Sequence, residues 1–220
     1  MIKATYIDHM GSDLSVVNAA RVSFGKKSEM VCSDHQIGTY ELKEGDKRLI
    51  KYLAKHKHLS PFGHAFASFH VKAPIFVARQ LVKHKFLRWN EISRRYVDDE
   101  PEFYMPDVWR GRSADKKQGS EGEVKLGTLD AAIVADSPYE ALCAYKSLLE
   151  AGVAPEQARM VLPQSTMTEW YWSGSLDALA DMCRLRCAAD TQVETRLVAD
   201  QINEKMSELF PVSWVALRDE

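Results

Sequence analysis

The sequence predicts an α+β (or α/β) fold formed by a single domain over residues 1–220. Stretches with helical spacing of apolar residues alternate along the chain with short stretches rich in β-branched and aromatic residues, which is typical of both classes. There is no internal repeat and no linker long enough to separate two domains. A chain of 220 residues with 45% hydrophobic residues can bury a substantial core, which agrees with one domain.

The first 64 residues predict two helices joined by irregular chain. Residues 13–21 carry apolar side chains on one side, and Asp13 is expected to open this helix. Residues 25–45 are polar and irregular, and a second helix is expected over residues 45–57. Residues 58–64 contain proline and glycine and are expected to form a loop.

A strand and a third helix are expected next. Residues 65–72 read as a strand, with Phe66, Phe69 and Val71 as its alternating apolar side chains. Residues 74–85 are expected to form a helix that begins with proline, because the missing N–H of proline costs nothing in the first turn. The chain after this helix is expected to continue as a loop.

The second half begins with a stretch rich in Gly, Ser, Lys and Glu, so residues 110–128 are expected to form a mobile surface loop or lid. Residues 137–140, Ser-Pro-Tyr-Glu, have the form of a capping box and predict the start of a helix that ends at Gly152. Pro155 is expected to open a short helix that Pro163 stops.

The last part predicts one strand and two helices. Residues 166–173 are β-branched and aromatic and read as a strand. Ser175 or Asp177 is expected to cap a helix that runs through Ala189, and a final helix is expected over residues 191–209.

Composition restricts the function classes. The net charge is only -2, so the cationic cluster near residue 83 is local, and it suits a small phosphorylated ligand better than long nucleic acid. No secretion signal and no apolar stretch long enough to span a membrane is visible. The cysteine spacing fits neither a zinc site nor a disulfide framework. Cys183 and Cys187 are therefore expected to be reduced core thiols of a cytoplasmic protein, and no metal site is expected.

The most informative segment is Arg79–Tyr96. It follows an apolar run, residues 73–78, and combines several lysines and arginines with one histidine, one carboxylate, two amides and a serine. A generic basic run is a solvated helix face. Here the polar residues are ones that orient a ligand, so a polyanion site on a rigid base is the better interpretation.

This segment resembles the signature of the flavin-dependent thymidylate synthases. That signature is Arg-His-Arg, seven residues, Ser, usually Gly or Ala, then Arg and Tyr. The chain has Lys83-His84-Lys85, seven residues, and Ser93-Arg94-Arg95-Tyr96, so the spacing is kept while both signature arginines are lysines. Further blocks similar to the family follow the same order along the chain: Ala20–Ser23, His56–Phe62, Ala158–Pro163 and Leu185-Arg186.

The resemblance implies the fold of that family, a single domain with a central, mostly antiparallel sheet flanked by helices. It implies a methyltransferase that converts dUMP to dTMP by reductive methylation at C5, with FAD as cofactor, 5,10-methylenetetrahydrofolate as carbon donor and NADPH as reductant. It also implies a homotetramer with active sites at subunit interfaces, in which the 110–128 segment could gate folate access. The flavin route needs no protein nucleophile, and no cysteine here has an activated context.

The resemblance also implies the site residues. Arg186 is the expected catalytic residue, which contacts the uracil and favours its N3-ionised form. The implied dUMP contacts are Gln80, Lys83, Glu91, Ser93, Arg94, Arg95, Arg159 and Arg186. The implied FAD contacts are His58, Ser60, Lys83, His84, Lys85, Glu91, Ser175 and Asp181.

Some positions depart from the family pattern. Lysine is a point charge without the planar fork of arginine, so Lys83 and Lys85 leave open how the phosphates are held. Arg88 and Arg94 are hypothesised to compensate. An aspartate stands at residue 177 and at residue 181, in a block where the family commonly carries asparagines. A carboxylate beside a diphosphate is unfavourable, so either these side chains face elsewhere or the cofactor is held differently.

Three other functions remain open from the sequence. One is a related flavin-dependent C5 methylase or hydroxymethylase that acts on UMP or dCMP. Another is a single-stranded nucleic-acid-binding module that stacks bases on Phe86, Trp89 and Tyr96, which predicts strongly salt-dependent affinity for oligonucleotides. The last is a degenerate homologue kept for interaction, against which the intact arginines argue.

Overall fold

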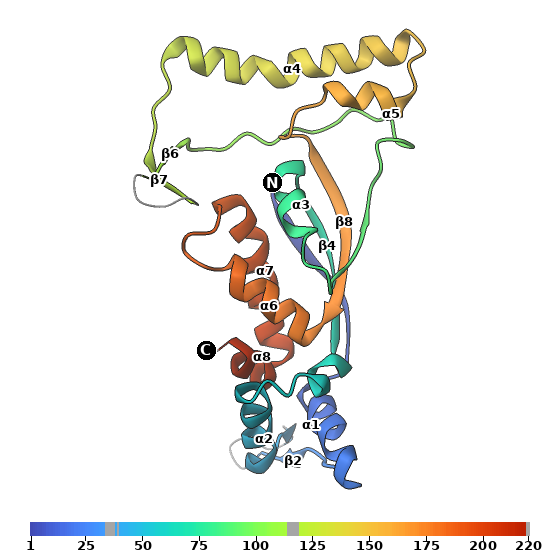
Figure 1. Cartoon of the computed structure of the whole chain (residues 1–220), viewed down its shortest axis with the longest axis vertical. Helices are drawn as coiled ribbons and strands as arrows, with labels where there is room; N and C mark the ends of the chain where they lie inside the picture. Colours follow the sequence, from blue (N-terminus) through green and yellow to red (C-terminus); the bar gives the residue numbers. More distant parts are fainter. Residues whose placement is uncertain (34–37, 39, 114–118, 219–220) are drawn as a thin grey trace.

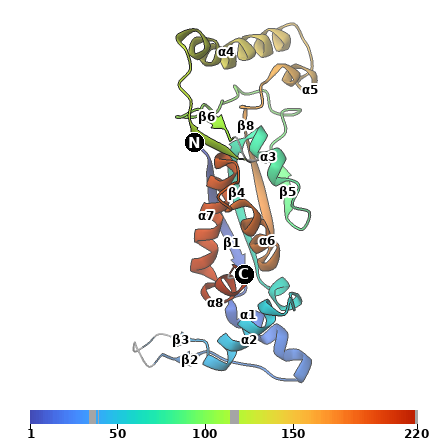
Figure 2. The same ribbon diagram turned by 60° about the vertical axis from the view of Figure 1, so that its left-hand side comes forward.

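The computed structural model describes residues 1–33, 38, 40–113 and 119–218. Its centre is a four-stranded sheet in the order β1-β4-β8-β5 (Figures 1 and 2). The strands are β1 (Lys3–Met10), β4 (Phe66–Pro74), β8 (Met167–Ser175) and β5 (Arg88–Glu91). Every pair in it is antiparallel. The expected antiparallel central sheet is confirmed.

One face of the sheet is apolar. Ala67, Phe69 and Val71 of β4 are buried, and Trp170 and Trp172 of β8 join them. Phe66 was predicted to share this face, which is wrong, since 39% of it is exposed. Successive side chains of a strand point to opposite faces, so a residue three positions from Phe69 must lie on the other side.

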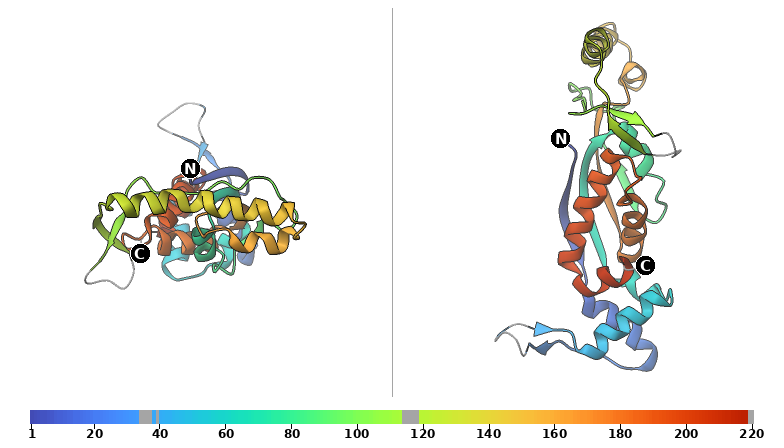
Figure 3. Two further views of the ribbon diagram at one scale, coloured as in Figure 1. Left: turned by 90° about the horizontal axis from the view of Figure 1, so that it is seen from above. Right: turned by 90° about the vertical axis from the view of Figure 1, so that its left-hand side faces the viewer.

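The helices α6 (Leu176–Arg186) and α7 (Val193–Leu209) cover the apolar face, and α8 (Pro211–Arg218) packs against the lower ends of both (Figure 3). The N-cap of α6 is Ser175, as predicted, but α6 ends at Arg186 rather than Ala189. Two elements were not predicted from the sequence: α8, which begins with a proline directly after Phe210, and β1, an edge strand without regular alternation of burial.

The lower end of the molecule in Figure 1 holds the remaining N-terminal elements. They are α1 (Asp13–Arg21), η1 (Val22–Phe24), β2 (Val31–Cys32), β3 (Tyr40–Glu41), α2 (Glu44–Lys55) and η2 (Ser60–His64). Both predicted helices are confirmed, but Ser12 rather than Asp13 is the N-cap of α1. The Asp13 carboxylate instead accepts the backbone N–H groups of Val212 and Ser213 at the start of α8.

The helix α3 (Ile75–Leu81) is shorter than predicted. Pro74 ends β4 and is the N-cap of α3, and the helix stops before the signature. Residues 83–85 therefore lie in the turn between α3 and β5, and residues 88–91 form a strand where a loop was expected. Pairing with β8 extends this segment, as the register Trp89↔Trp172 shows.

The upper end of Figure 1 holds the hairpin strands β6 (Arg110–Arg112) and β7 (Ser120–Glu123), the long helix α4 (Thr128–Glu150), and α5 (Pro155–Ala158) with η3 (Arg159–Val161). The predicted helix start at residues 137–140 is wrong, because Pro138 lies inside α4. The hydroxyl of Ser137 donates to the carbonyl of Val134 at 3.4 Å, which replaces the N–H that Pro138 lacks. A loop was expected over residues 110–128, but parts of it form the strands β6 and β7. Residues 114–118 lie outside the described residues.

None of the helices described combines the length and the apolar character that a membrane crossing needs.

Candidate active site

A cavity of about 520 Å³ lies where the turn after α3 meets the end of α6 and the loop before α7. Its lining includes Gln80, Lys83, Arg184, Arg186, Asp190 and Gln192. Gly119 also lines it with a φ of +87°, and a Cβ at this position would lie 2.9 Å from the carbonyl oxygen of Asp190. Only glycine therefore allows the chain before β7 to come this close to the loop before α7.

Arg186 is held in one orientation at the edge of this cavity. Its Nε donates to Nε2 of His84 at 3.1 Å, and its Nη2 lies 3.4 Å from the backbone oxygen of Gln80. These contacts occupy one side of the half-buried guanidinium. The remaining N–H groups are left for a ligand, which suits recognition of a carbonyl or an anionic ring edge.

His84 is neutral at physiological pH. Burial, together with the positive charge of Arg186, lowers the pKa of His84 to about 4, and Asp181 opposes this only in part. A neutral imidazole can accept the Arg186 N–H at Nε2 only if its proton sits on Nδ1. Burial also lowers the pKa of Arg186 from its usual value, yet an arginine remains charged.

The amide of Gln80 has a partner at each end. Its Nε2 donates to Oε1 of Gln192, and its Oε1 accepts the hydroxyl of Thr195 at 3.2 Å. Gln80 follows Arg79 on the last turn of α3, and Gln192 and Thr195 stand at the start of α7. The loop before α7 and its first turn thus determine how Gln80 faces the cavity.

Glu91 is held on the edge strand β5. Its Oε1 accepts the hydroxyl of Thr168 at 2.6 Å, and its Oε2 accepts the indole N–H of Trp89 at 3.1 Å. Trp89 stacks on Trp170 with ring centroids 4.3 Å apart. The packed tryptophan rings thus continue from β5 to Trp172, whose ring centroid lies 6.3 Å from that of His84.

Three predicted contacts follow β5. Ser93 Oγ accepts Nε of Arg95 at 3.2 Å, and the Arg95 guanidinium lies over the ring of Tyr96. Arg95 is exposed and keeps donors for a phosphate. Arg94 pairs with Asp99 through one nitrogen at 3.2 Å, and its remaining N–H groups are left for a ligand.

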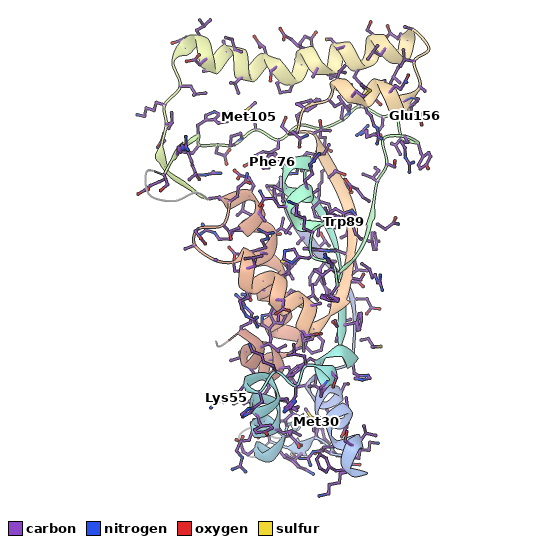
Figure 4. The ribbon with its side chains drawn as sticks, viewed as in Figure 1. Met30, Lys55, Phe76, Trp89, Met105 and Glu156 are labelled. Atoms are coloured by element: carbon purple, nitrogen blue, oxygen red, sulfur yellow. The ribbon has the colours of Figure 1, made fainter. Side chains whose placement is uncertain are left out.

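Arg159 lies apart from the cavity. It is exposed at the start of η3, and its Nε donates to the backbone oxygen of Glu156 at 3.1 Å. Figure 4 labels Glu156 at the upper end of the molecule, beside α5, and Lys55 at the lower end. The turn after α3 and the end of α6, whose residues line the cavity, lie between these two ends (Figure 1). The described chain does not bring Arg159 to the cavity that holds Arg186.

The remaining residues predicted for FAD divide into two places. Lys83 and Lys85 flank His84 and are exposed beside the cavity. His58 and Ser60 lie at η2, which packs beside Ser175 and α6, as the bond from Leu176 N to Ala65 O shows. Asp181 lies farther along α6.

The donor set near η2 and α6 fits a flavin dinucleotide. The N-terminus of α6 offers backbone N–H groups to phosphate, and Lys83 and Lys85 offer positive charge at the other place, beside the C-terminal end of α6. The carboxylate of Asp181 is offset by Arg184 at 2.9 Å. Oδ1 of Asp177 is buried without a hydrogen-bond partner among the described residues, and the hydroxyl groups of a flavin side chain are donors of the kind it lacks.

Gln192, Glu194 and Thr195 were not predicted from the sequence as site residues. Glu194 is 3% exposed and accepts Nη2 of Arg110 at 2.5 Å. It borders a second cavity, of about 470 Å³, which Phe76 and Met105 also line. Figure 4 shows these two residues below the long helix that Figure 1 labels α4. The only signal in the sequence was that these three polar residues stand close together at the start of a predicted helix.

The four cysteines are free. Cys183 is buried, its thiol donates to the carbonyl of Ala199 at 3.6 Å, and burial raises its pKa well above the usual value. Cys187 is half-buried at the C-cap of α6, whereas Cys32 and Cys143 are exposed. The expectation of a core thiol is met fully by Cys183 and partly by Cys187.

The fold and the cavity define a class of protein. A helix-covered antiparallel sheet presents an oriented arginine, a neutral histidine and further cations around one cavity, which is the arrangement of an enzyme for an anionic, ring-containing substrate. The sequence profile of the thymidylate synthase complementing proteins matches residues 5–212, and the chain belongs to that family.

Similar proteins with assigned names support this family membership. The chain is 43% identical over 213 residues to the flavin-dependent thymidylate synthase of Thermus thermophilus, covering 97% of this chain and 74% of that protein. It is 39% identical to the flavin-dependent thymidylate synthase of Thermosipho melanesiensis, covering 93% of this chain and 85% of that one. The expected membership of the flavin-dependent thymidylate synthases is confirmed.

The fold also matches that of a solved structure. A UMP/dUMP methylase, PolB from Streptomyces cacaoi, bound with 5-Br dUMP, superposes with a TM-score of 0.81 and 31% identity, covering 100% of this chain and 95% of that one. The same protein bound with 5-Br UMP gives a TM-score of 0.79. These matches do not favour a nucleic-acid-binding module.

Proposed function

We propose that this protein converts dUMP to dTMP by reductive methylation at C5, with FAD as cofactor and with 5,10-methylenetetrahydrofolate and NADPH as co-substrates. The observation that carries the proposal is the pair formed by Arg186 and His84 at the edge of a cavity that Gln80 and Lys83 also line. It occurs in a chain that matches named flavin-dependent thymidylate synthases over 93% or more of its length.

Arg186 is the proposed catalytic residue. Methylation at C5 requires an electron-rich ring, and a cation beside the ring stabilises the N3-ionised uracil that has this property. His84 accepts a hydrogen bond from the Nε–H of Arg186. It adds no positive charge, because its pKa of about 4 keeps it neutral. The guanidinium therefore keeps its orientation and its full charge for the substrate.

Phosphate and sugar contacts are proposed for the other polar residues. Lys83 lies at the cavity and Arg95 is exposed with free donors, so both suit the nucleotide phosphate. Gln80 is proposed to contact the base or the sugar. The complete proposed set of dUMP contacts is Gln80, Lys83, Glu91, Ser93, Arg94, Arg95, Arg159 and Arg186.

FAD is proposed to lie along the turn after α3 and the region where η2 meets α6. When bound, it supplies the redox chemistry that reductive methylation requires. The residues proposed to hold it are His58, Ser60, Lys83, His84, Lys85, Glu91, Ser175 and Asp181. Lys83 and Lys85 would offset the diphosphate charge as point charges, without the bidentate geometry of arginine.

A homotetramer with shared active sites is proposed, and two observations support it. Arg95 and Arg159 are absent from the lining of the cavity that holds Arg186, although all three are proposed to contact one nucleotide. In addition, α4 has Tyr145 as its one buried residue and exposes Leu129, Ile133 and Tyr139, which is unusual for a helix of 23 residues. A second copy would cover this helix and supply the missing arginines.

The shared site can be tested by mixing two inactive variants. Arg95→Ala and Arg186→Ala should each abolish activity on their own. A mixed assembly of the two variants should regain activity, because a site between subunits can take Arg95 from an Arg186→Ala subunit and Arg186 from an Arg95→Ala subunit. Random mixing would restore roughly a quarter of the sites. Activity that stays absent in mixed assemblies of confirmed composition would contradict a site that draws these two arginines from different subunits.

The activity is tested by tritium release from C5-labelled dUMP with FAD, methylenetetrahydrofolate and NADPH supplied. Release that needs both FAD and the folate, with dTMP as product, is the expected result. Absence of release from folded protein that binds FAD and dUMP would overturn the proposal.

UMP is the second candidate substrate, because the solved PolB structures are described as a UMP/dUMP methylase. The relatives of higher identity are named thymidylate synthases, so dUMP is preferred. Competition between the two nucleotides in the same assay distinguishes them. The cytoplasm is the proposed location, since it holds the nucleotide, folate and NADPH pools that the reaction uses.

A further inference from the structure

Glu194 is a buried carboxylate outside the residues proposed to touch either ligand. It is 3% exposed and receives three hydrogen bonds, from Nη2 of Arg110 at 2.5 Å, from the hydroxyl of Tyr104 at 3.3 Å and from Nε2 of Gln192 at 3.2 Å. Burial alone would raise the pKa of Glu194, but the hydrogen bonds and the charge of Arg110 hold it below its usual value. Glu194 is therefore ionised and can only accept.

An acceptor-only group determines the orientation of the amide beside it. Gln192 must turn its NH₂ toward Glu194, and its Oε1 is then left for Gln80. Gln80 must in turn present its own NH₂ to Gln192, and its Oε1 accepts the hydroxyl of Thr195. Each amide could otherwise be reversed by 180° at little steric cost, since its oxygen and nitrogen are similar in size.

The chain of amides ends at the cavity. Gln80 and Gln192 both line the cavity that holds Arg186, whereas Glu194 and Arg110 line the second cavity on the other side of Gln192. Gln80 retains one N–H and one lone pair beyond its bonds to Gln192 and Thr195. Glu194 thus determines where a donor and an acceptor stand in the nucleotide cavity, although it does not line that cavity itself.

We infer that Glu194 is a positioning residue for the pyrimidine nucleotide, which acts through Gln192 to set the amide of Gln80. The inference rests on the proposed function, in which Gln80 contacts the nucleotide. Arg110 has a supporting part, because its Nε also donates to Ser120 at 2.9 Å and so joins the hairpin of β6 and β7 to Glu194.

The substitution Glu194→Gln tests this, because glutamine keeps the size of the side chain but can donate as well as accept. Gln192 is then free to reverse, and Gln80 with it. The KM for dUMP should rise roughly tenfold, the effect of one misplaced hydrogen bond, while kcat changes by less than about threefold. An unchanged KM in a folded, FAD-binding variant would overturn the inference.

A double-mutant cycle separates positioning from general damage. If Glu194 acts through Gln80, then Glu194→Gln should change the KM by less than about twofold in a Gln80→Ala background. Equal effects in both backgrounds would overturn the inference. Asp13→Asn is the matched control: Asp13 is also a buried carboxylate that accepts two hydrogen bonds, at the start of α8, and its substitution should lower the melting temperature without moving the KM.

Failure of the inference differs from failure of the proposed function. Wild-type protein that releases no tritium and binds no dUMP, measured by calorimetry, would contradict the proposed function itself. Wild-type protein that is active while Glu194→Gln keeps the wild-type KM would contradict the inference alone.

Discussion

Nε of Arg186, at the end of α6, donates to Nε2 of His84, in the turn after α3, over 3.1 Å. The contact joins two residues 102 positions apart and places His84, the one unchanged residue of the Arg-His-Arg triplet, against the proposed catalytic arginine. The turn that carries the lysine-substituted signature therefore has a defined structural task, which is to orient Arg186.

Replacing His84 should leave the charge of Arg186 intact but remove the contact that orients its guanidinium. His84→Ala removes the acceptor of the Arg186 Nε, so the guanidinium gains rotational freedom, and kcat for tritium release should fall roughly ten- to a hundredfold. His84→Gln retains an acceptor oxygen and should lose less. FAD binding, followed by flavin fluorescence, separates this effect from a weakened cofactor site. Wild-type kcat in His84→Ala would refute the orienting role.

Replacing Arg186 by lysine should be almost as harmful as replacing it by alanine. Lysine keeps the charge but not the fork that bonds His84 and Gln80 while facing a ligand. We expect kcat/KM to fall at least about a hundredfold, the effect of losing a preorganised charge-stabilising group. Arg196→Lys on α7, where Arg196 pairs weakly with Asp200, is the control and should leave the rate within about twofold. A rate close to that of wild type in Arg186→Lys would argue against bidentate contact.

Stability should fall as the medium becomes acidic. The unfolded chain protonates His84 at its usual pKa of 6.5, but the folded chain does so only near 4, so the unfolded state binds more protons between these values. The contribution of His84 is thus complete above pH 6.5 and is lost progressively as the pH falls to 4. We expect a loss of about 1–2 kcal/mol in the free energy of unfolding, after allowance for the half-exposed ring.

Urea unfolding at several pH values measures this contribution. In His84→Gln the difference between pH 7 and pH 4 should shrink by the same amount, because glutamine does not titrate. A pH dependence identical to that of wild type would show that other groups account for the acid sensitivity.

Gly174 of β8 should resist substitution. A Cβ there would lie 2.2 Å from Cδ2 of Leu87, which is buried directly before β5. Gly174→Ala must push Leu87 aside, and we expect a loss of about 1–3 kcal/mol in the free energy of unfolding. Gly45→Ala is the control: it lies in α2, where a Cβ meets no atom within 4 Å, and should be neutral or stabilising. Chemical denaturation compares the two, and equal stabilities would contradict the packing argument.

The exposed face of α4 should be required for assembly. Ile133 is 59% exposed, and Ile133→Glu would place a charge in an apolar subunit interface. Light scattering after gel filtration should show a smaller particle than for wild type, together with loss of bound FAD. Glu204→Lys, an exposed charge reversal on α7, is the control and should leave the particle mass unchanged. An unchanged mass for Ile133→Glu would remove α4 from the proposed interface.

Local sequence patterns were sufficient for much of the secondary structure. The helices α1 and α2, the strands β4 and β8 and the short helix at Pro155 all follow from periodicity, capping residues and turn chemistry within a few positions. Gly152, with a φ of +83°, follows the end of α4 as predicted. The chemical types of the site residues, and the family, could also be read from the spacing of the signature.

Other features depended on contacts between distant parts of the chain. The helix α3 ends at Leu81 and β5 is a strand because β8 supplies the pairing partner, which no local pattern encodes. One exception is local: Pro138 lies inside α4, where the hydroxyl of Ser137 satisfies the carbonyl of Val134 that proline leaves unpaired, and the capping signal at residues 137–140 was misleading.

The sequence by itself determined which functional groups this protein carries and their order along the chain, because residue type and spacing are local properties. Only the tertiary structure decided that His84 lies against Arg186, and that Glu194, through Gln192, sets Gln80. Such pairs form when the packing of α6 and α7 against the sheet buries polar groups that must then find partners, and the partner is chosen by proximity in the folded core rather than along the chain.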